Sequence, residues 1–131
     1  IAATFPTEPA DPLKVNSVWQ GTGQQSKPAL TYPIILFVQQ RWGGEFEGVT
    51  WYPTLGNGLS TATGRIEASG VVTFSEDEVI FGEATEQRLG ILAGAKYTAK
   101  LGKMTLKGNG EWMDPKTKEV ATLTILLKLA E

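Results

Sequence analysis

Residues 32–53 read YPIILFVQQRWGGEFEGVTWYP, and this stretch decides the fold. Two apolar, aromatic-rich runs flank Trp42-Gly43-Gly44. A three-residue hairpin loop combines a type I turn with a left-handed residue, which is usually glycine. Because Gly44 fits that third position, the stretch predicts a β-hairpin that supplies both partners of one strand pair.

The loop type sets the register of this hairpin. The three-residue loop predicts that Arg41 lies opposite Glu45 and that Phe37 lies opposite Val49. The alternative is a two-residue turn on the glycine pair, which shifts every partner by one position and places Phe46 beside Arg41. The turn chemistry favours the three-residue loop.

The three-residue register divides the hairpin into two faces. The first face is mainly apolar and is predicted to be the inner one: Ile34, Leu36, Val38, Gln40, Phe46, Gly48, Thr50 and Tyr52. The second carries all the charge and is predicted to be the outer one: Ile35, Phe37, Gln39, Arg41, Glu45, Glu47, Val49 and Trp51.

Composition limits the range of functions. The chain has 131 residues, which suggests one domain, and its net charge of −2 favours neither nucleic acid nor an anionic membrane. It has no cysteine, which excludes disulfides and thiolate catalysis, and no histidine, the usual general base and the commonest metal ligand. The longest apolar run, Ile34 to Val38, is too short to span a bilayer. We therefore predict no metal, no cofactor, no nucleic-acid partner and no transmembrane segment.

The chain divides into a tail and one folded domain. Residues 1–14 read IAATFPTEPADPLK, a proline-rich composition typical of an extended linker or disordered tail. Such a segment would tether the domain to an upstream domain or to a membrane anchor. Residues 15–131 are predicted to form a single β-domain. The first residue is Ile rather than Met, so we expect a processed form or a piece of a longer protein, in an undetermined compartment.

A second hairpin is predicted over residues 96–112. Gly102-Lys103 suits a type II′ turn, which needs glycine at its first central position. This turn places Leu101 opposite Met104 and Tyr97 opposite Gly108. A glycine that faces an aromatic ring is common in barrels, because the ring covers the exposed backbone.

The remaining strands are separated by turn signals. Asn57-Gly58 is a strong type I′ signal, and Ser69-Gly70 and Glu76-Asp77 are also predicted to be turns. Residues 83–95 predict either a short helical turn or an irregular crossover. The further strands are predicted at residues 15–25, 60–68, 71–75, 78–82 and 120–129.

Together these elements predict an all-β fold. Eight or nine strands joined by tight hairpins form an antiparallel up-and-down meander, and closure into a barrel removes its edges. A β-sandwich is the alternative, but its longer crossovers have only residues 83–95 as a candidate. We expect that the barrel interior is not a ligand pocket, because inward side chains fill it: Leu36, Val38, Phe46, Tyr52, Tyr97, Leu101, Met104, Leu106, Leu123, Ile125 and Leu127.

This pattern resembles the calycin group of small up-and-down barrels, the lipocalin-like and avidin- or streptavidin-like folds. The features that carry the resemblance are Trp19-Gln20-Gly21-Thr22, the meander length, Tyr97-Thr98-Ala99-Lys100-Leu101 and Gly110-Glu111-Trp112. The chain is also similar to uncharacterised bacterial barrel domains that follow linkers in larger proteins. Lipocalins carry Gly-x-Trp where this chain has Trp-x-Gly, and the avidin-like biotin contacts have no residue-by-residue match. The resemblance implies a fold and no ligand.

Several groups of residues are candidates for a site. Arg41 with Glu45 and Glu47, and Arg65 with Glu67, are predicted to be mainly surface charges. Glu76, Asp77 and Glu78 are predicted to form a charged turn without a calcium site. Aromatic residues near the hairpins are mostly core, but an exposed Phe37 and Trp51 would mark a partner site. The candidate ligand or partner contacts are Phe37, Trp51, Arg41, Arg65, Glu67, Tyr97 and Trp112.

Three functions remain open. The favoured one is a non-catalytic accessory or binding domain of a larger bacterial protein, because no nucleophile–base pair is visible. The second is a lipocalin-like carrier of a small apolar ligand. The third is an enzyme that relies on carboxylates and arginine, with Glu47, Arg65, Glu67 or Glu111 as actors. A buried carboxylate with a raised pKa in a cleft would favour the enzyme, and a large cavity would favour the carrier. Functional contacts are expected on the outside near Phe37 and Trp51, or at a barrel mouth near residues 83–95.

Overall fold

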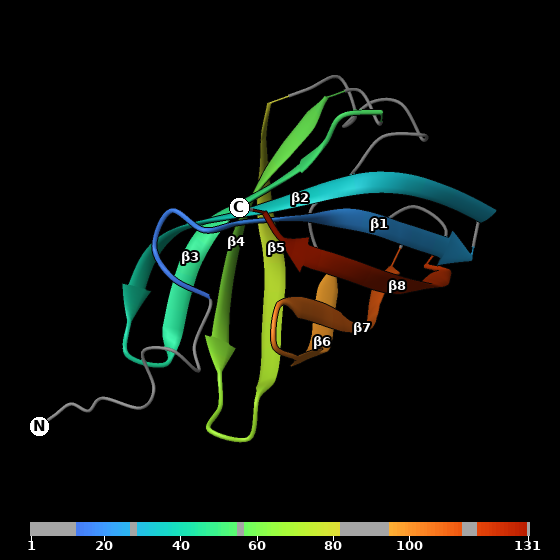
Figure 1. Ribbon diagram of the computed structural model, residues 1–131. Helices are drawn as coiled ribbons and strands as arrows, with labels where there is room; N and C mark the ends of the chain where they lie inside the picture. Colours follow the sequence, from blue (N-terminus) through green and yellow to red (C-terminus); the bar gives the residue numbers. More distant parts are fainter. Residues whose placement is uncertain (1–12, 27–28, 55–56, 82–94, 114–117, 131) are drawn as a thin grey trace, which may run out of the picture.

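The computed structural model describes residues 13–26, 29–54, 57–81, 95–113 and 118–130. Within these residues, eight strands form one closed antiparallel barrel in which each strand pairs with the next and β8 pairs with β1 (Figure 1). This confirms the predicted all-β meander and barrel, because closure leaves no second sheet for a sandwich. The strands are β1 Val18–Ser26, β2 Ala29–Trp42, β3 Glu45–Tyr52, β4 Gly58–Ile66, β5 Val71–Phe81, β6 Lys96–Leu101, β7 Thr105–Met113 and β8 Val120–Leu129.

The barrel interior follows the period-2 alternation of the strands. In β8, every second residue from Ala121 to Leu127 is buried and the residues between them are exposed. The same alternation buries Ile34, Leu36 and Val38 in β2. Ten of the eleven side chains predicted to point inward belong to this core or pack against it. Whether they fill the interior completely stays a prediction.

The central hairpin combines features of both predicted registers. At its tip Trp42 pairs with Glu45 and Arg41 with Phe46, so the two-residue glycine turn is correct there and the predicted Arg41–Glu45 pair is wrong. A β-bulge at Gln39 then shifts the register, and Phe37 lies opposite Val49 as predicted. A bulge inserts one extra residue in one strand, which restores the pairing that the shorter turn had displaced.

The bulge also changes the side of the sheet that Arg41 occupies. Arg41 was predicted on the outer face, but it lies opposite Phe46, which is fully buried, and so belongs to the inner face. Its guanidinium donates hydrogen bonds to the carbonyl oxygens of Leu13 and, at 2.7 Å, of Gly43. Leu13 is itself buried in the core. Arg41 therefore ties the segment that enters β1 to the tip of the central hairpin.

The second hairpin is shifted from its predicted register by two residues. Leu101 pairs with Leu106 and Tyr97 with Gly110, because the turn lies one residue later than predicted: Gly102 N donates to Thr105 O at 2.8 Å, and Lys103 and Met104 lie between them. Met104 is consequently 41% exposed, and its predicted inward position is wrong. Tyr97 does cover a glycine as predicted, but this glycine is Gly110 and not Gly108. The shift by an even number of residues keeps the inner and outer faces unchanged.

The predicted turn at Glu76-Asp77 does not exist. Strand β5 runs through these residues from Val71 to Phe81 and pairs with β4 along its whole length. Two bulges, with Asp77 and Ile80 as the extra residues, interrupt the pairing. The first bulge lets Glu76 point inward while Asp77 and Glu78 both stay exposed.

Gly48 allows β3 to approach β2 beside the Gln39 bulge. A β-carbon at Gly48 would overlap the carbonyl oxygen of Phe37 and lie 3.0 Å from its carbonyl carbon. We expect Gly48→Ala to lower the free energy of unfolding by about 1–3 kcal/mol, the typical cost of overpacking. The matched control is Gly43→Asn, since the φ of Gly43 is +60° and nothing lies within 4 Å of its β-carbon position. Urea titrations of both variants that gave equal midpoints would contradict this account.

Two predicted segments fall wholly or partly outside the described residues. Of the predicted tail, residues 1–12 lie outside, whereas Leu13 belongs to the core. Residues 83–94 of the predicted crossover also lie outside, and Ala95 is buried. No helix in the described part of the chain has the length and hydropathy needed to cross a membrane.

Candidate functional site

A carboxylate is buried among the inward side chains of the barrel. Glu76 is only 3% exposed, and it lies opposite Ala62 of β4. Its backbone N–H donates to the carbonyl oxygen of Ala95 at 2.8 Å, which continues the pairing of β5 with the chain that leads into β6. Bulges occur frequently next to functional sites, where they redirect a side chain, and Glu76 directly precedes one.

Hydroxyl groups surround this carboxylate. Thr50 donates a hydrogen bond of 2.6 Å to Glu76 Oε2, and Tyr52 donates another to the same oxygen. The hydroxyls of Tyr52 and Tyr97 are 3.3 Å apart. The ring of Tyr32 meets that of Tyr52 edge-on at 5.5 Å. We call Thr50, Tyr52, Glu76, Tyr97 and Tyr32 the inner polar cluster.

Burial dominates the electrostatics of this cluster. The pKa of Glu76 is raised from 4.5 to about 7. Removal from water is the largest cause, the hydrogen bonds from Thr50 and Tyr52 partly oppose it, and the nearby charge of Asp77 adds a smaller rise. Burial and the charge of Glu76 raise the pKa of Tyr32 to about 12. The same causes hold the pKa values of Tyr52 and Tyr97 well above their usual value. The tyrosines therefore remain neutral donors at pH 7, while Glu76 exists in both protonation states.

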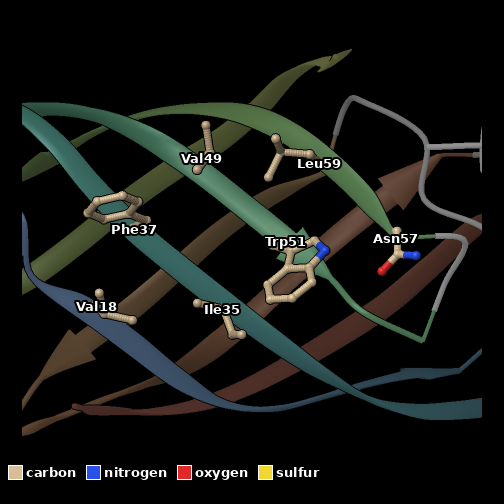
Figure 2. A pocket seen from close by; sticks show the side chains of 7 residues that line it. All are labelled: Val18, Ile35, Phe37, Val49, Trp51, Asn57 and Leu59. Atoms are coloured by element: carbon tan, nitrogen blue, oxygen red, sulfur yellow. The ribbon is translucent and has the colours of Figure 1, made fainter. Parts of the chain in front are cut away.

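A second feature lies on the outer surface. A pocket of about 280 Å³ spans the outward faces of β1 to β4, and Figure 2 shows its side chains standing on one side of the sheet. Trp51 is 39% exposed and stands beside Ile35 on the neighbouring strand β2, and Phe37 lies two residues further along β2, opposite Val49 (Figure 2). The residues that line this outer pocket are Val18, Ile35, Phe37, Val49, Trp51, Asn57 and Leu59.

The structure separates the residues predicted as candidate contacts. Phe37 and Trp51 line the outer pocket together, as the predicted register implied. Tyr97 belongs to the inner polar cluster, and Trp112 is half-buried against the core. Arg41 lies at the inner side of the central hairpin and joins neither group.

The charged candidates lie on the surface. Arg65 forms an ion pair of 2.9 Å with Glu45, and both side chains are more than half exposed, so the pair contributes little to stability. Arg65 and Glu67 were predicted to share a strand face, but Glu67 follows the end of β4. Glu47 and Glu111 are exposed on β3 and β7. These residues do not converge on one site.

Sequence reasoning missed Glu76 as a functional residue. The three adjacent acidic residues 76–78 are typical of a solvated turn, and alternation alone places Glu76 and Glu78 on the same face. One signal was present: Val72, Phe74 and Glu76 continue one period-2 series, which places Glu76 on the apolar side of the strand.

No protein-family model, curated protein or solved structure matches this chain. The inner polar cluster and the outer pocket must therefore be interpreted from their own geometry. Among the described residues, no three metal-ligating side chains lie close enough together to hold an ion. The chemistry that the described residues offer is hydrogen bonding and proton exchange at Glu76, and apolar contact in the outer pocket.

Proposed function

We propose that this chain is a non-catalytic binding domain, calycin-like in fold, that serves as an accessory module of a larger bacterial protein. It would bind a protein segment that presents large apolar side chains to the outer pocket. The observation that carries this proposal is the pocket around Trp51 and Phe37, where large apolar side chains remain accessible on the surface of a complete barrel. Exposed apolar patches of this kind mark interaction sites.

The size and position of the outer pocket favour a protein partner over a free small molecule. Small-molecule sites usually measure about 300–1,000 Å³ and enclose about 70–90% of the ligand surface. This pocket is smaller, at about 280 Å³, and its floor is the outer face of one curved sheet. It suits the insertion of one or two side chains from a partner that also covers the surrounding surface.

The chemistry of the pocket lining specifies the partner further. None of the seven lining residues is charged, and Asn57 is the polar one among them. Interface cores are depleted of charge and enriched in aromatic residues, and Trp is the commonest type of hot-spot residue. Because β2, β3 and β4 are paired on both sides where they line the outer pocket, a partner at this place cannot add a strand to an edge. Recognition then depends on side chains such as Leu or Phe entering the pocket.

Substitution of Trp51 tests this function. Peptides selected from a displayed random library on the wild-type domain should carry large apolar residues and should bind Trp51→Ala about 30-fold more weakly, as expected for a hot spot of about 2 kcal/mol. Fluorescence polarisation measures both affinities. Trp42→Ala is the matched control, because Trp42 is 54% exposed at the hairpin tip and does not line the pocket. Equal affinity of the Trp51→Ala variant, or selected peptides without apolar residues, would exclude the outer pocket as the binding site.

A small-ligand carrier is the second candidate function, and one observation favours it. Glu76 and its hydroxyl partners make part of the barrel interior polar, although an apolar core would satisfy packing. Glu76 meets part of the expectation for an enzyme, because it is a buried carboxylate with a raised pKa. An enzyme is nevertheless less well supported, because the predicted actors Glu47, Arg65 and Glu67 are exposed and do not converge with Glu76. A carrier would use the interior, so it is independent of the outer pocket.

A further inference from the structure

Glu76 and Trp112 point into the barrel from strands that are separated by one strand. The pairs Ser75–Lys96 and Lys96–Glu111 fix the register of β5, β6 and β7. One step further along this register, Glu76, Ala95 and Trp112 stand side by side, and the hydrogen bond from Glu76 N to Ala95 O confirms the first of these steps. Adjacent strands are about 4.8 Å apart, so the two Cα atoms are separated by about 10 Å.

Small side chains occupy the positions around these two residues. Ala95 stands between Glu76 and Trp112, Ala62 lies opposite Glu76 on β4, and Ala121 lies opposite Trp112 on β8. All three alanines are buried. Along this row, a large polar side chain and a large aromatic side chain alternate with methyl groups. A small planar molecule placed over Ala95 would contact Glu76 on one side and Trp112 on the other.

Trp112 contributes a donor that has no acceptor. Its indole Nε1 is buried and makes no hydrogen bond, although the ring itself packs against the core. A buried donor without a partner costs about 1–3 kcal/mol. Such groups are rare in native proteins and call for an explanation such as a bound molecule.

Glu76 contributes acceptor capacity on the other side. A carboxylate offers about four acceptor positions, and the described contacts from Thr50 and Tyr52 use two of them, both on Oε2. Ser60 adds a buried hydroxyl near the cluster, and its described hydrogen bond, to the carbonyl oxygen of Thr61, is long at 3.5 Å. An unmatched donor and a spare acceptor therefore belong to inward positions that are separated by Ala95 alone in the register of β5, β6 and β7.

We propose that the end of the barrel interior that holds Glu76 and Trp112 departs from the expected complete filling and forms a binding site for a small, planar, uncharged ligand that bears an N–H donor beside a carbonyl acceptor, as a primary amide does. Glu76 accepts the hydrogen bond from the ligand N–H, and Trp112 Nε1 donates to the ligand carbonyl. Phe74 and Tyr97, whose rings stack at 4.8 Å, lie next to Glu76 and Ala95 along β5 and β6 and provide an aromatic wall. An anionic ligand is disfavoured, because it would meet the Glu76 carboxylate and find no cationic partner in the inner polar cluster.

Benzamide is a suitable probe, because it carries both groups on one flat ring. In the wild-type domain, titration with benzamide should shift the indole N–H resonance of Trp112 and the carboxyl carbon resonance of Glu76 in NMR spectra. The Trp112 resonance is assigned by its loss in Trp112→Phe. Affinity is expected in the millimolar range for a ligand of this size. The Glu76→Gln and Trp112→Phe variants should each bind at least 10-fold more weakly.

The controls separate this site from the outer pocket and from simple apolar uptake. Trp51→Ala should bind benzamide with unchanged affinity, so failure of the outer pocket proposal would leave this one standing. Benzoate should not shift either resonance, and toluene should bind at least 10-fold more weakly than benzamide. Because the two resonances are observed in the wild-type protein, the test does not depend on how the variants fold. Unshifted resonances at 20 mM benzamide, a concentration on the order of ten times the expected dissociation constant, or equal affinity for toluene, would overturn the proposal.

Discussion

The free energy of unfolding of the wild-type domain is expected to fall by about 3 kcal/mol between pH 4.5 and pH 7, and the Glu76→Gln variant should not show this fall. Burial raises the pKa of Glu76 from 4.5 to about 7, so the folded state holds this proton more tightly than the unfolded state does. A raised pKa in the folded state contributes stability that is fully present below pH 4.5 and is lost as the pH rises through about 7. Each tenfold change in proton affinity is worth about 1.4 kcal/mol, which gives this magnitude.

Urea titrations at several pH values between 4 and 8 measure this dependence. The wild-type free energy of unfolding should fall across the window relative to Glu76→Gln and run parallel to it above pH 8. Asp77→Asn is the matched control, because Asp77 is the adjacent acidic residue and is exposed. It should retain the wild-type fall. A constant difference between wild type and Glu76→Gln at every pH would show that Glu76 does not titrate in this range.

The second large effect is expected from Leu106→Ala, which should lower the free energy of unfolding by about 2–5 kcal/mol. Leu106 is completely buried on the inner face of β7, where it lies opposite Leu101 and Leu127. Its truncation would leave a cavity in a packed interior. Met104→Ala, two residues earlier in the hairpin loop, is the matched control, and its 41% exposed side chain should cost less than about 1 kcal/mol.

Denaturation of both variants, monitored by circular dichroism, gives the comparison. If the Leu106→Ala variant is nearly as stable as the wild type and the domain takes up an apolar dye, the interior is already open. That outcome would contradict the prediction that side chains fill the barrel. It would leave the outer pocket unaffected, because Trp51 and Phe37 stand on the opposite side of the sheet.

Local sequence patterns were sufficient to predict which face of most strands points into the barrel. The alternation in β8 and the apolar residues 34, 36 and 38 predicted inward positions correctly, because the two sides of a strand differ in burial and the pattern has a period of two residues. The same logic placed Phe37 and Trp51 together on the outer face. The sequence therefore indicated the outer pocket, because it placed two aromatic residues on the charged, outer face of the hairpin.

The positions of bulges and turns could not be predicted from the sequence in the same way. The position of a bulge depends on how neighbouring strands pair when the barrel closes, and no local residue preference predicts it. The bulge at Gln39 turned Arg41 inward, and the bulge at Asp77 left Glu78 exposed, so that Glu76 is the one residue of the acidic run that points inward. In the second hairpin, the turn lies on Lys103-Met104, one residue later than the predicted Gly102-Lys103 turn, and this leaves Met104 exposed.

The sequence by itself determined the all-β class, the antiparallel order of the strands and the inward series of most of them, but it left their number at eight or nine because β5 was predicted as two strands. These properties follow from turn residues and from period-2 patterning, which act over a few neighbouring residues. Closure of the barrel was predicted, but only the tertiary structure decided the register in which β8 pairs with β1, the contacts of Glu76 with Thr50 and Tyr52, and the position of Trp112 on the strand next to Ala95. The physical reason is that strand closure and bulges bring together residues that lie far apart in the chain, and the cost of burying each polar group depends on those distant neighbours.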